Sequence, residues 1–269
     1  MALLKAIEST TVRERVSEVE WQVRVDLAAC YRLMALYGMT DLIYNHITAR
    51  IPGTADELLI NPYGMLYEEI TASSLVKIDI EGNILLQPDR EYGINPAGYV
   101  IHSAVHHARQ DVQCVIHTHS RAGMAVSAMS CGLLPLAQTS MRFYNCTSYH
   151  AFEGPALNLD ERLRLVSDLG NNDTLILRNH GLLVCGRTIP DAFNRMYFLE
   201  NACRLQVDAM AAGADLQFAP PAVAQLTADI LSPERSTTNS IHTAKPLDGE
   251  LEWRALRRKL DRTDPSYAD

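Results

Sequence analysis

The sequence has no long apolar run and no strong excess of charge of one sign. Its apolar stretches are too short to cross a bilayer, and the N-terminal segment around Arg13 lacks the apolar core that secretory signals carry. The net charge is −8, with acidic and basic residues spread along all 269 positions. No basic face is therefore expected to attract nucleic acid or an anionic membrane. We expect a cytoplasmic protein with neither of these partners.

Cysteine pairing motifs are also absent. The six cysteines are scattered and form no Cys-x-x-Cys pair, at Cys30, Cys114, Cys131, Cys146, Cys185 and Cys203. This distribution favours small buried apolar side chains in a reducing compartment over disulfides or a cysteine-bound zinc ion.

Helical and strand-like segments alternate along the chain. Apolar residues at helical spacing predict a helix from Glu18 to Tyr37, ended by Gly38, and Asn95-Pro96 is typical of a helix start. Further helices are expected at residues 121–129, 160–170 and 190–212. Strands are expected at residues 43–50, 57–60, 75–80, 84–86, 111–116 and 173–177. This alternation predicts a sheet covered by helices, with mixed or antiparallel pairing.

The composition changes after residue 212. From Gly213 to about Pro246 the chain is rich in Ala, Pro, Ser and Thr, while Leu251 to Leu260 is expected to form a terminal helix. We therefore expect one domain over residues 1–212, followed over residues 213–269 by an irregular C-terminal arm with a short terminal helix.

Three histidines follow apolar runs. His117 and His119 lie one residue apart at the end of one run, and His180 follows another. Side chains at i and i+2 of a strand project from the same face, so the first two imidazoles could share a divalent cation with a ligand from elsewhere in the chain. Gly181 permits close backbone approach beside His180. The pattern predicts a metal site at His117, His119 and His180, although a His-x-His pair alone is weak evidence.

Four motifs occur in a fixed order, namely Tyr44-Asn-His-Ile-Thr48, Leu59-Ile-Asn-Pro-Tyr-Gly-Met65, His117-Thr-His119 and Leu177-Arg-Asn-His-Gly-Leu182. Together they resemble the class II aldolase and adducin family over about residues 20 to 212. The resemblance implies a three-layer α/β/α sandwich with a largely antiparallel central sheet. It also implies a homotetramer with active sites at subunit interfaces. The three histidines would hold one divalent ion per chain, Zn first and Mn or Fe as alternatives.

The resemblance also implies that an acid/base group is missing. The family's sugar-phosphate aldolases open the helix before the histidine pair with Pro-Ser-Ser-Glu, whereas this chain has Pro96-Ala97-Gly98. Gly98 thus replaces the catalytic glutamate, and Pro96 and Ala97 replace serines that hold the substrate phosphate. Tyr63-Gly64 stands where a phosphate-binding Thr-Gly is found. We therefore expect an unphosphorylated substrate. At these positions the chain is closest to adducin heads, which belong to cytoskeletal proteins without established lyase activity.

Other polar residues are candidates for proton transfer or substrate binding. His102, on the predicted helix after Gly98, could supply the missing proton-transfer group, and so could His150 or Glu153. A surface histidine, or a buried one satisfied within the core, is the alternative for His102. Substrate contacts are expected from Arg121, Arg142 and Arg178. The resemblance implies a further contact from Asn45, for which the alternative is a turn residue. A guanidinium can bind a carboxylate through two hydrogen bonds, and an ordinary structural ion pair is the alternative role for each arginine.

These observations favour a metal-dependent carbon–carbon lyase, either a decarboxylase or an aldolase, acting on a small unphosphorylated carboxylate or carbonyl compound. Decarboxylation needs no base to remove a hydroxyl proton, so the loss of the glutamate would matter less. One alternative is a non-catalytic, adducin-like assembly or scaffold protein, which the missing acid/base favours and the intact metal ligands disfavour. Another is a non-haem iron oxygenase that uses three histidines.

Overall fold

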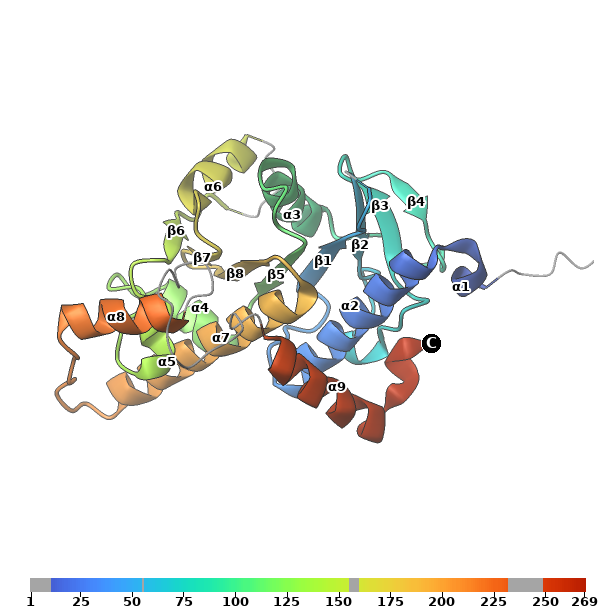
Figure 1. The fold of residues 1–269 in the computed structure, drawn as a ribbon. Helices are drawn as coiled ribbons and strands as arrows, with labels where there is room; N and C mark the ends of the chain where they lie inside the picture. Colours follow the sequence, from blue (N-terminus) through green and yellow to red (C-terminus); the bar gives the residue numbers. More distant parts are fainter. Residues whose placement is uncertain (1–10, 55, 155–159, 232–248) are drawn as a thin grey trace, which may run out of the picture.

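The computed structural model describes residues 11–54, 56–154, 160–231 and 249–269 (Figure 1). Within these residues one sheet of eight strands has the order β4-β3-β2-β1-β5-β8-β7-β6. The strands are β1 (His46–Arg50), β2 (Glu57–Ile60), β3 (Val76–Asp79), β4 (Ile84–Leu86), β5 (Cys114–Thr118), β6 (Ser148–His150), β7 (Thr174–Leu177) and β8 (Gly181–Gly186). The helices are α1 (Val12–Arg15), α2 (Glu18–Leu36), α3 (Pro96–Ala108), α4 (Arg121–Ser127), α5 (Gln138–Met141), α6 (Glu161–Leu169), α7 (Ile189–Ala211), α8 (Pro221–Leu231) and α9 (Glu250–Thr263), with 3-10 turns η1 (Tyr67–Glu69) and η2 (Pro265–Ala268).

The sheet is mixed. Neighbouring strands from β4 to β7 pair antiparallel, whereas β6 pairs parallel with β7. In the sequence α6 lies between β6 and β7, and a helix is the usual connection between two parallel strands. The pattern of the sequence allowed mixed pairing, and the expectation of a largely antiparallel sheet is corrected by this parallel edge.

Helices cover both faces of the sheet, as Figure 1 shows. Alternate residues of a strand point to opposite faces, and here Ile116 joins a core with residues of α2, α7 and α9 while its neighbour Val115 joins a second core with residues of α3 and α6. This arrangement is compatible with the three layers expected from the sequence.

The C-terminal residues contribute to the main core. The terminal helix expected at residues 251–260 is α9, and α8 lies within the segment expected to be irregular. Trp253 and Leu260 of α9 and Tyr267 of η2 are buried in the same core as α2 and α7. A domain boundary at residue 212 stays a prediction. In the described part of the chain, no helix combines the length and the apolar character that a membrane span requires.

Candidate metal centre

Three strands bring the histidines together. His117 lies in the central strand β5, His119 follows that strand, and His180 lies in the turn between β7 and β8. In that turn Asn179 adopts a left-handed conformation with φ 56°, which Asn tolerates better than most residues. Since β8 pairs with β5, the turn places His180 beside the end of β5. A Cβ added at Gly181 would lie 2.2 Å from the carbonyl oxygen of Thr118, so this approach requires glycine.

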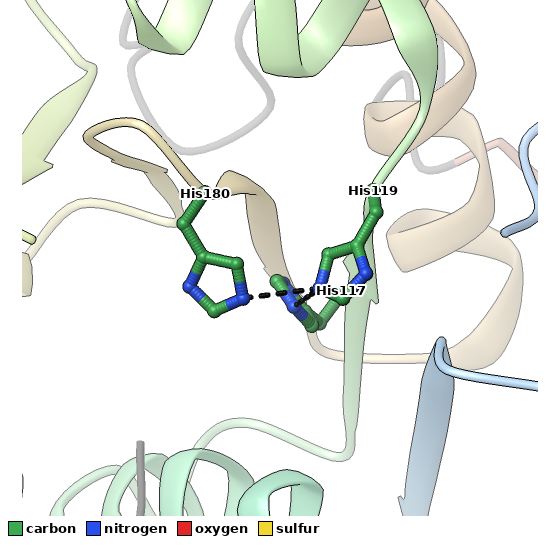
Figure 2. Close-up of side chains that lie close together, drawn as sticks. All are labelled: His117, His119 and His180. Atoms are coloured by element: carbon green, nitrogen blue, oxygen red, sulfur yellow. Dashed lines mark hydrogen bonds between the residues drawn. The ribbon is translucent and has the colours of Figure 1, made fainter. Parts of the chain in front are cut away.

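The three imidazole rings converge through their Nε2 atoms (Figure 2). The Nε2 of His119 lies 2.9 Å from that of His117 and 3.0 Å from that of His180. All three ligand atoms lie within 4.8 Å of one another. The structure thus brings together the three histidines predicted as metal ligands, namely His117, His119 and His180, which form a histidine triad.

Hydrogen bonds on the outer side of two rings fix where their protons lie. His117 Nδ1 is 2.9 Å from the carbonyl oxygen of Leu182, and His119 Nδ1 is 3.3 Å from a carboxylate oxygen of Asp41. Both oxygens are acceptors, so each Nδ1 carries the proton and each Nε2 has a lone pair. Two lone pairs facing each other at 2.9 Å repel unless a cation lies between them. The donor set therefore fits a divalent metal ion.

Burial keeps the ligands in the neutral form that binds metals. It lowers the pKa of His117 well below its usual value and lowers that of His180 to about 4. It also lowers the pKa of His119, although the hydrogen bond with Asp41 opposes this effect. Three neutral imidazoles are a ligand set that leaves coordination positions of a zinc-like ion open to substrate.

The three predicted proton-transfer residues lie in different surroundings. His102 is buried on α3 and hydrogen-bonded to His46 and Thr48. His46 in turn lies beside the ring of His117. The buried His150 lies 2.7 Å from a carboxylate oxygen of Asp168 and 3.4 Å from one of Glu161. Glu153 is exposed and forms an ion pair with Arg164. The catalytic roles of all three stay predictions.

The predicted substrate-binding residues are also dispersed. Asn45 is fully buried, and among the described residues neither atom of its side-chain amide has a hydrogen-bond partner. Arg121 is exposed at the start of α4 and lines a surface cleft of about 640 Å³. The guanidinium of Arg142 lies over the ring of Phe198. Their roles stay predictions.

Arg178 lies in the same turn as His180, between β7 and β8, and its side chain is held by contacts within the protein. Its guanidinium lies 4.2 Å from the ring centroid of Tyr149 and donates to the carbonyl oxygen of Met129 at 2.7 Å. Substrate binding by Arg178, which its place two residues before His180 predicts, would have to compete with these contacts.

Three residues near the triad were not predicted. Asp41 contacts His119, the ring centroid of His46 is 5.0 Å from that of His117, and the half-exposed ring of Phe152 has its centroid 6.3 Å from that of His180. His46 alone carried a usable signal, because it alternates with Thr48 in a predicted strand. Asp41 and Phe152 lie outside periodic segments.

Known proteins are similar to this chain in sequence and fold. The family model described as class II aldolase and adducin N-terminal domain matches residues 25–207. An aldolase II superfamily protein from Pseudomonas syringae is 48% identical with a TM-score of 0.87, over 97% of this chain and 100% of that one. An L-fuculose 1-phosphate aldolase from Glaciozyma antarctica is 26% identical with a TM-score of 0.78, over 92% of each chain. Alpha-adducin from Mus musculus is 43% identical over 190 residues, which are 70% of this chain and 26% of the adducin.

Proposed function

The chain belongs to the class II aldolase and adducin family, and we propose that it is a metal-dependent carbon–carbon lyase, an aldolase or a decarboxylase. Its substrate is a small unphosphorylated carboxylate or carbonyl compound. One observation carries this proposal, namely that His117 and His119 direct lone pairs at each other from 2.9 Å with His180 completing the set. We also propose one divalent ion per chain, with Zn first, a homotetrameric assembly and a cytoplasmic location.

The chain's own residues prepare the site for this chemistry. An ion bound by three imidazoles would act as a Lewis acid on carbonyl and hydroxyl oxygens and stabilise the negative charge that remains when a carbon–carbon bond breaks. The carbonyl of Leu182 and the carboxylate of Asp41 fix the orientation of His117 and His119. Phe152 gives the site an apolar wall beside His180.

The residues at the expected phosphate site support an unphosphorylated substrate. Pro96 has no N–H group to donate. The ring of Tyr63 lies 6.4 Å from that of Tyr44, centroid to centroid, and its backbone N–H donates to Gly93. Phosphate recognition needs several converging hydroxyl or amide donors, and this segment supplies few.

A second candidate is a non-catalytic assembly protein, which the similarity to alpha-adducin favours. A scaffold has no chemical need for converging neutral imidazoles, so stoichiometric metal together with turnover would argue against it. A third candidate is an iron oxygenase, because three histidines also suit iron. Oxygen consumption by iron-loaded protein would distinguish it from a lyase.

The metal site is tested by metal analysis of protein purified without a histidine tag. We expect about one ion per chain in the wild type and loss of tight binding in His180→Ala, because two imidazoles rarely retain a zinc-like ion. The matched control is His107→Ala, which removes an exposed imidazole from α3. Stoichiometric metal in His180→Ala would contradict the assignment.

The reaction is tested by incubating metal-loaded protein with hydroxy-acids, keto-acids and β-hydroxy-carbonyl compounds. Release of carbon dioxide identifies a decarboxylase, whose second product can also be an aldehyde, whereas release of an aldehyde without carbon dioxide identifies an aldolase. Sedimentation of the same sample measures the oligomeric state. A metal-loaded tetramer that turns over no member of the panel would favour the scaffold.

A further inference from the structure

A chain of hydrogen bonds leads from the metal centre into the interior. His46 Nδ1 lies 2.8 Å from His102 Nε2, and the hydroxyl of Thr48 lies 2.7 Å from His102 Nδ1 and 2.8 Å from His106 Nε2. All four side chains are buried. At the outer end, His46 of β1 faces His117 of β5 directly across the antiparallel pair, with their ring centroids 5.0 Å apart.

The single proton of the Thr48 hydroxyl gives this chain a direction. The hydroxyl can donate to only one of its two imidazole neighbours, so the other imidazole must donate to its oxygen or leave that contact unbonded. The direction of the whole chain therefore depends on which nitrogen of His106 carries a proton.

The inner end of the chain decides the direction. His106 Nδ1 makes no full hydrogen bond among the residues that the structure describes. Burial lowers the pKa of this ring to about 3, and a weaker interaction with the backbone of Val112 opposes that shift. The N–H of Val112 already donates to Arg109, so the interacting group is the Val112 carbonyl, which is an acceptor. A proton on His106 Nδ1 suits that carbonyl, and His106 Nε2 is then an acceptor.

The remaining protons follow from this choice. Thr48 donates to His106 Nε2, His102 Nδ1 donates to Thr48, and His46 Nδ1 donates to His102 Nε2. His46 is therefore a neutral ring with an unprotonated Nε2. In this arrangement of protons no buried ring of the hydrogen-bond series carries a charge, which avoids the cost of burying an imidazolium.

The ring of His46 lies beside that of His117 in the metal centre, and its free nitrogen is not fully enclosed. Within the described residues this Nε2 makes no hydrogen bond. It also retains some accessible surface, unlike the fully buried polar atoms that have no partner. The ring itself packs against α3, where a Cβ added at Gly98 would lie 2.5 Å from His46 Cδ2 and 2.8 Å from His46 Nε2. Gly98 thus leaves the space that this ring occupies.

We propose that His46 is a substrate-binding residue whose unprotonated Nε2 accepts a hydrogen bond from a hydroxyl group of the substrate beside the metal centre. This inference rests on the proposed lyase site. A lone pair at this position cannot bond to a carboxylate or carbonyl oxygen, since neither can donate, so it selects a hydroxyl. The substrate class narrows to hydroxyl-bearing carbonyl or carboxylate compounds. His102, Thr48 and His106 are positioning residues that fix the tautomer of His46.

The tautomer is measured directly, without metal or substrate, by long-range proton–nitrogen correlation spectra of histidine-labelled full-length protein. We expect a pyridine-like Nε2 and a pyrrole-like Nδ1 for His46. Thr48→Val removes the hydroxyl with little change of shape and should give mixed tautomers. The matched control is Thr174→Val, which changes a buried threonine of β7 that takes no part in this series of hydrogen bonds. A protonated Nε2 in the wild type would overturn the proposal.

Selectivity is measured by calorimetry on zinc-loaded protein with glycolate and with methoxyacetate, in which a methyl group replaces the hydroxyl proton. We expect the preference for glycolate to fall roughly threefold to tenfold in His46→Phe, which loses one hydrogen bond, with zinc content unchanged. In Thr48→Val the preference should fall by less, because part of the protein keeps the accepting tautomer of His46. Wild-type protein that binds zinc but shows no such preference would refute this inference alone. Failure of the wild type to bind zinc would refute the proposed function instead, and loss of zinc in His46→Phe would make His46 a ligand and overturn its assigned role.

Discussion

Buried neutral histidines link the candidate site to the stability of the protein. Burial lowers the pKa of His106 to about 3 and that of His180 to about 4, and it holds the pKa of His46 and His102 well below the usual range. In the unfolded chain each imidazole takes up a proton near pH 6.5. Below that pH the unfolded state therefore binds more protons than the folded state.

We predict that the metal-free protein loses stability as the pH falls below about 6.5, the unfolded value. The contribution of His106 is complete above that pH and declines until the pH reaches about 3, by about 1.4 kcal/mol per pH unit for one such histidine. Urea unfolding at several pH values measures the slope. His106→Gln should make the slope shallower, whereas the exposed His107→Gln should not. Equal slopes in wild type and His106→Gln would contradict this account.

The sequence could predict that His117 and His119 lie on one face of a strand. It could not predict which groups form hydrogen bonds with the Nδ1 atoms of these rings. His117 and His119 share a face because a strand has a period of two, and this rule is local. The tautomers of these rings depend on Leu182 and Asp41, which come from β8 and from the loop before β1. Such contacts depend on strand pairing and loop path, which no local pattern of the sequence encodes.

At the scale of elements, the β5–β8 pair determines whether the triad closes. We predict that Gly181→Ala destabilises the protein by about 1–3 kcal/mol and weakens zinc binding, because the new methyl group would meet the Thr118 carbonyl and separate the strands. Urea unfolding and a zinc titration measure the two effects. Gly93→Ala is the matched control, since no atom lies within 4 Å of the position that its methyl group would take and its φ is not positive. Wild-type zinc affinity in Gly181→Ala would contradict the prediction.

The second prediction at this scale concerns a substitution in the first turn of α3. We predict that Gly98→Glu does not create a sugar-phosphate aldolase. Pro96 and Tyr63 would still fail to hold a phosphate, whose binding energy helps to position the reacting carbon. The new side chain would also displace the ring of His46, which lies where its Cβ must go. Assays with fuculose 1-phosphate and ribulose 5-phosphate check this, with Gly93→Glu as the control for added charge. Efficient cleavage by Gly98→Glu would show that the phosphate site was wrongly identified.

Long elements could be predicted better than short ones. The helices α2, α3 and α7 have sustained apolar spacing and recognisable starts, such as Ser17 and Thr188, whose side chains accept from the first turn. The strand β8 was not predicted, although it lies against His117. Its six residues are buried throughout, and a short apolar run gives no period by which to tell a strand from a turn or a helix.

At the scale of the whole molecule, apolar side chains lie exposed close to the three histidines. Tyr44 and Phe152 are about half exposed, and Leu42 is 67% exposed. Tyr44 lies in the segment between Asp41 and His46, which both contact triad residues. Exposed apolar surface beside a polar centre is typical of ligand-binding or interaction sites.

The last prediction concerns ligand binding by the intact protein. We predict that a hydroxy-acid stabilises the metal-loaded protein more than the metal-free protein, because its carboxylate and hydroxyl bind only when the metal centre is complete. A ligand that binds the folded state raises the unfolding free energy by RT ln(1 + [L]/Kd), about 2.7 kcal/mol at a hundredfold excess over Kd. Thermal melting with hydroxy-acids, keto-acids and hydroxy-aromatic acids, each with and without metal, measures the effect. His180→Ala is the control, since it should melt without response to any acid. If no acid stabilises the metal-loaded wild type while neutral aldehydes do, the carboxylate substrate is wrong and an aldol substrate replaces it. If neither class of compound has an effect, the adducin-like scaffold becomes the better account of this chain.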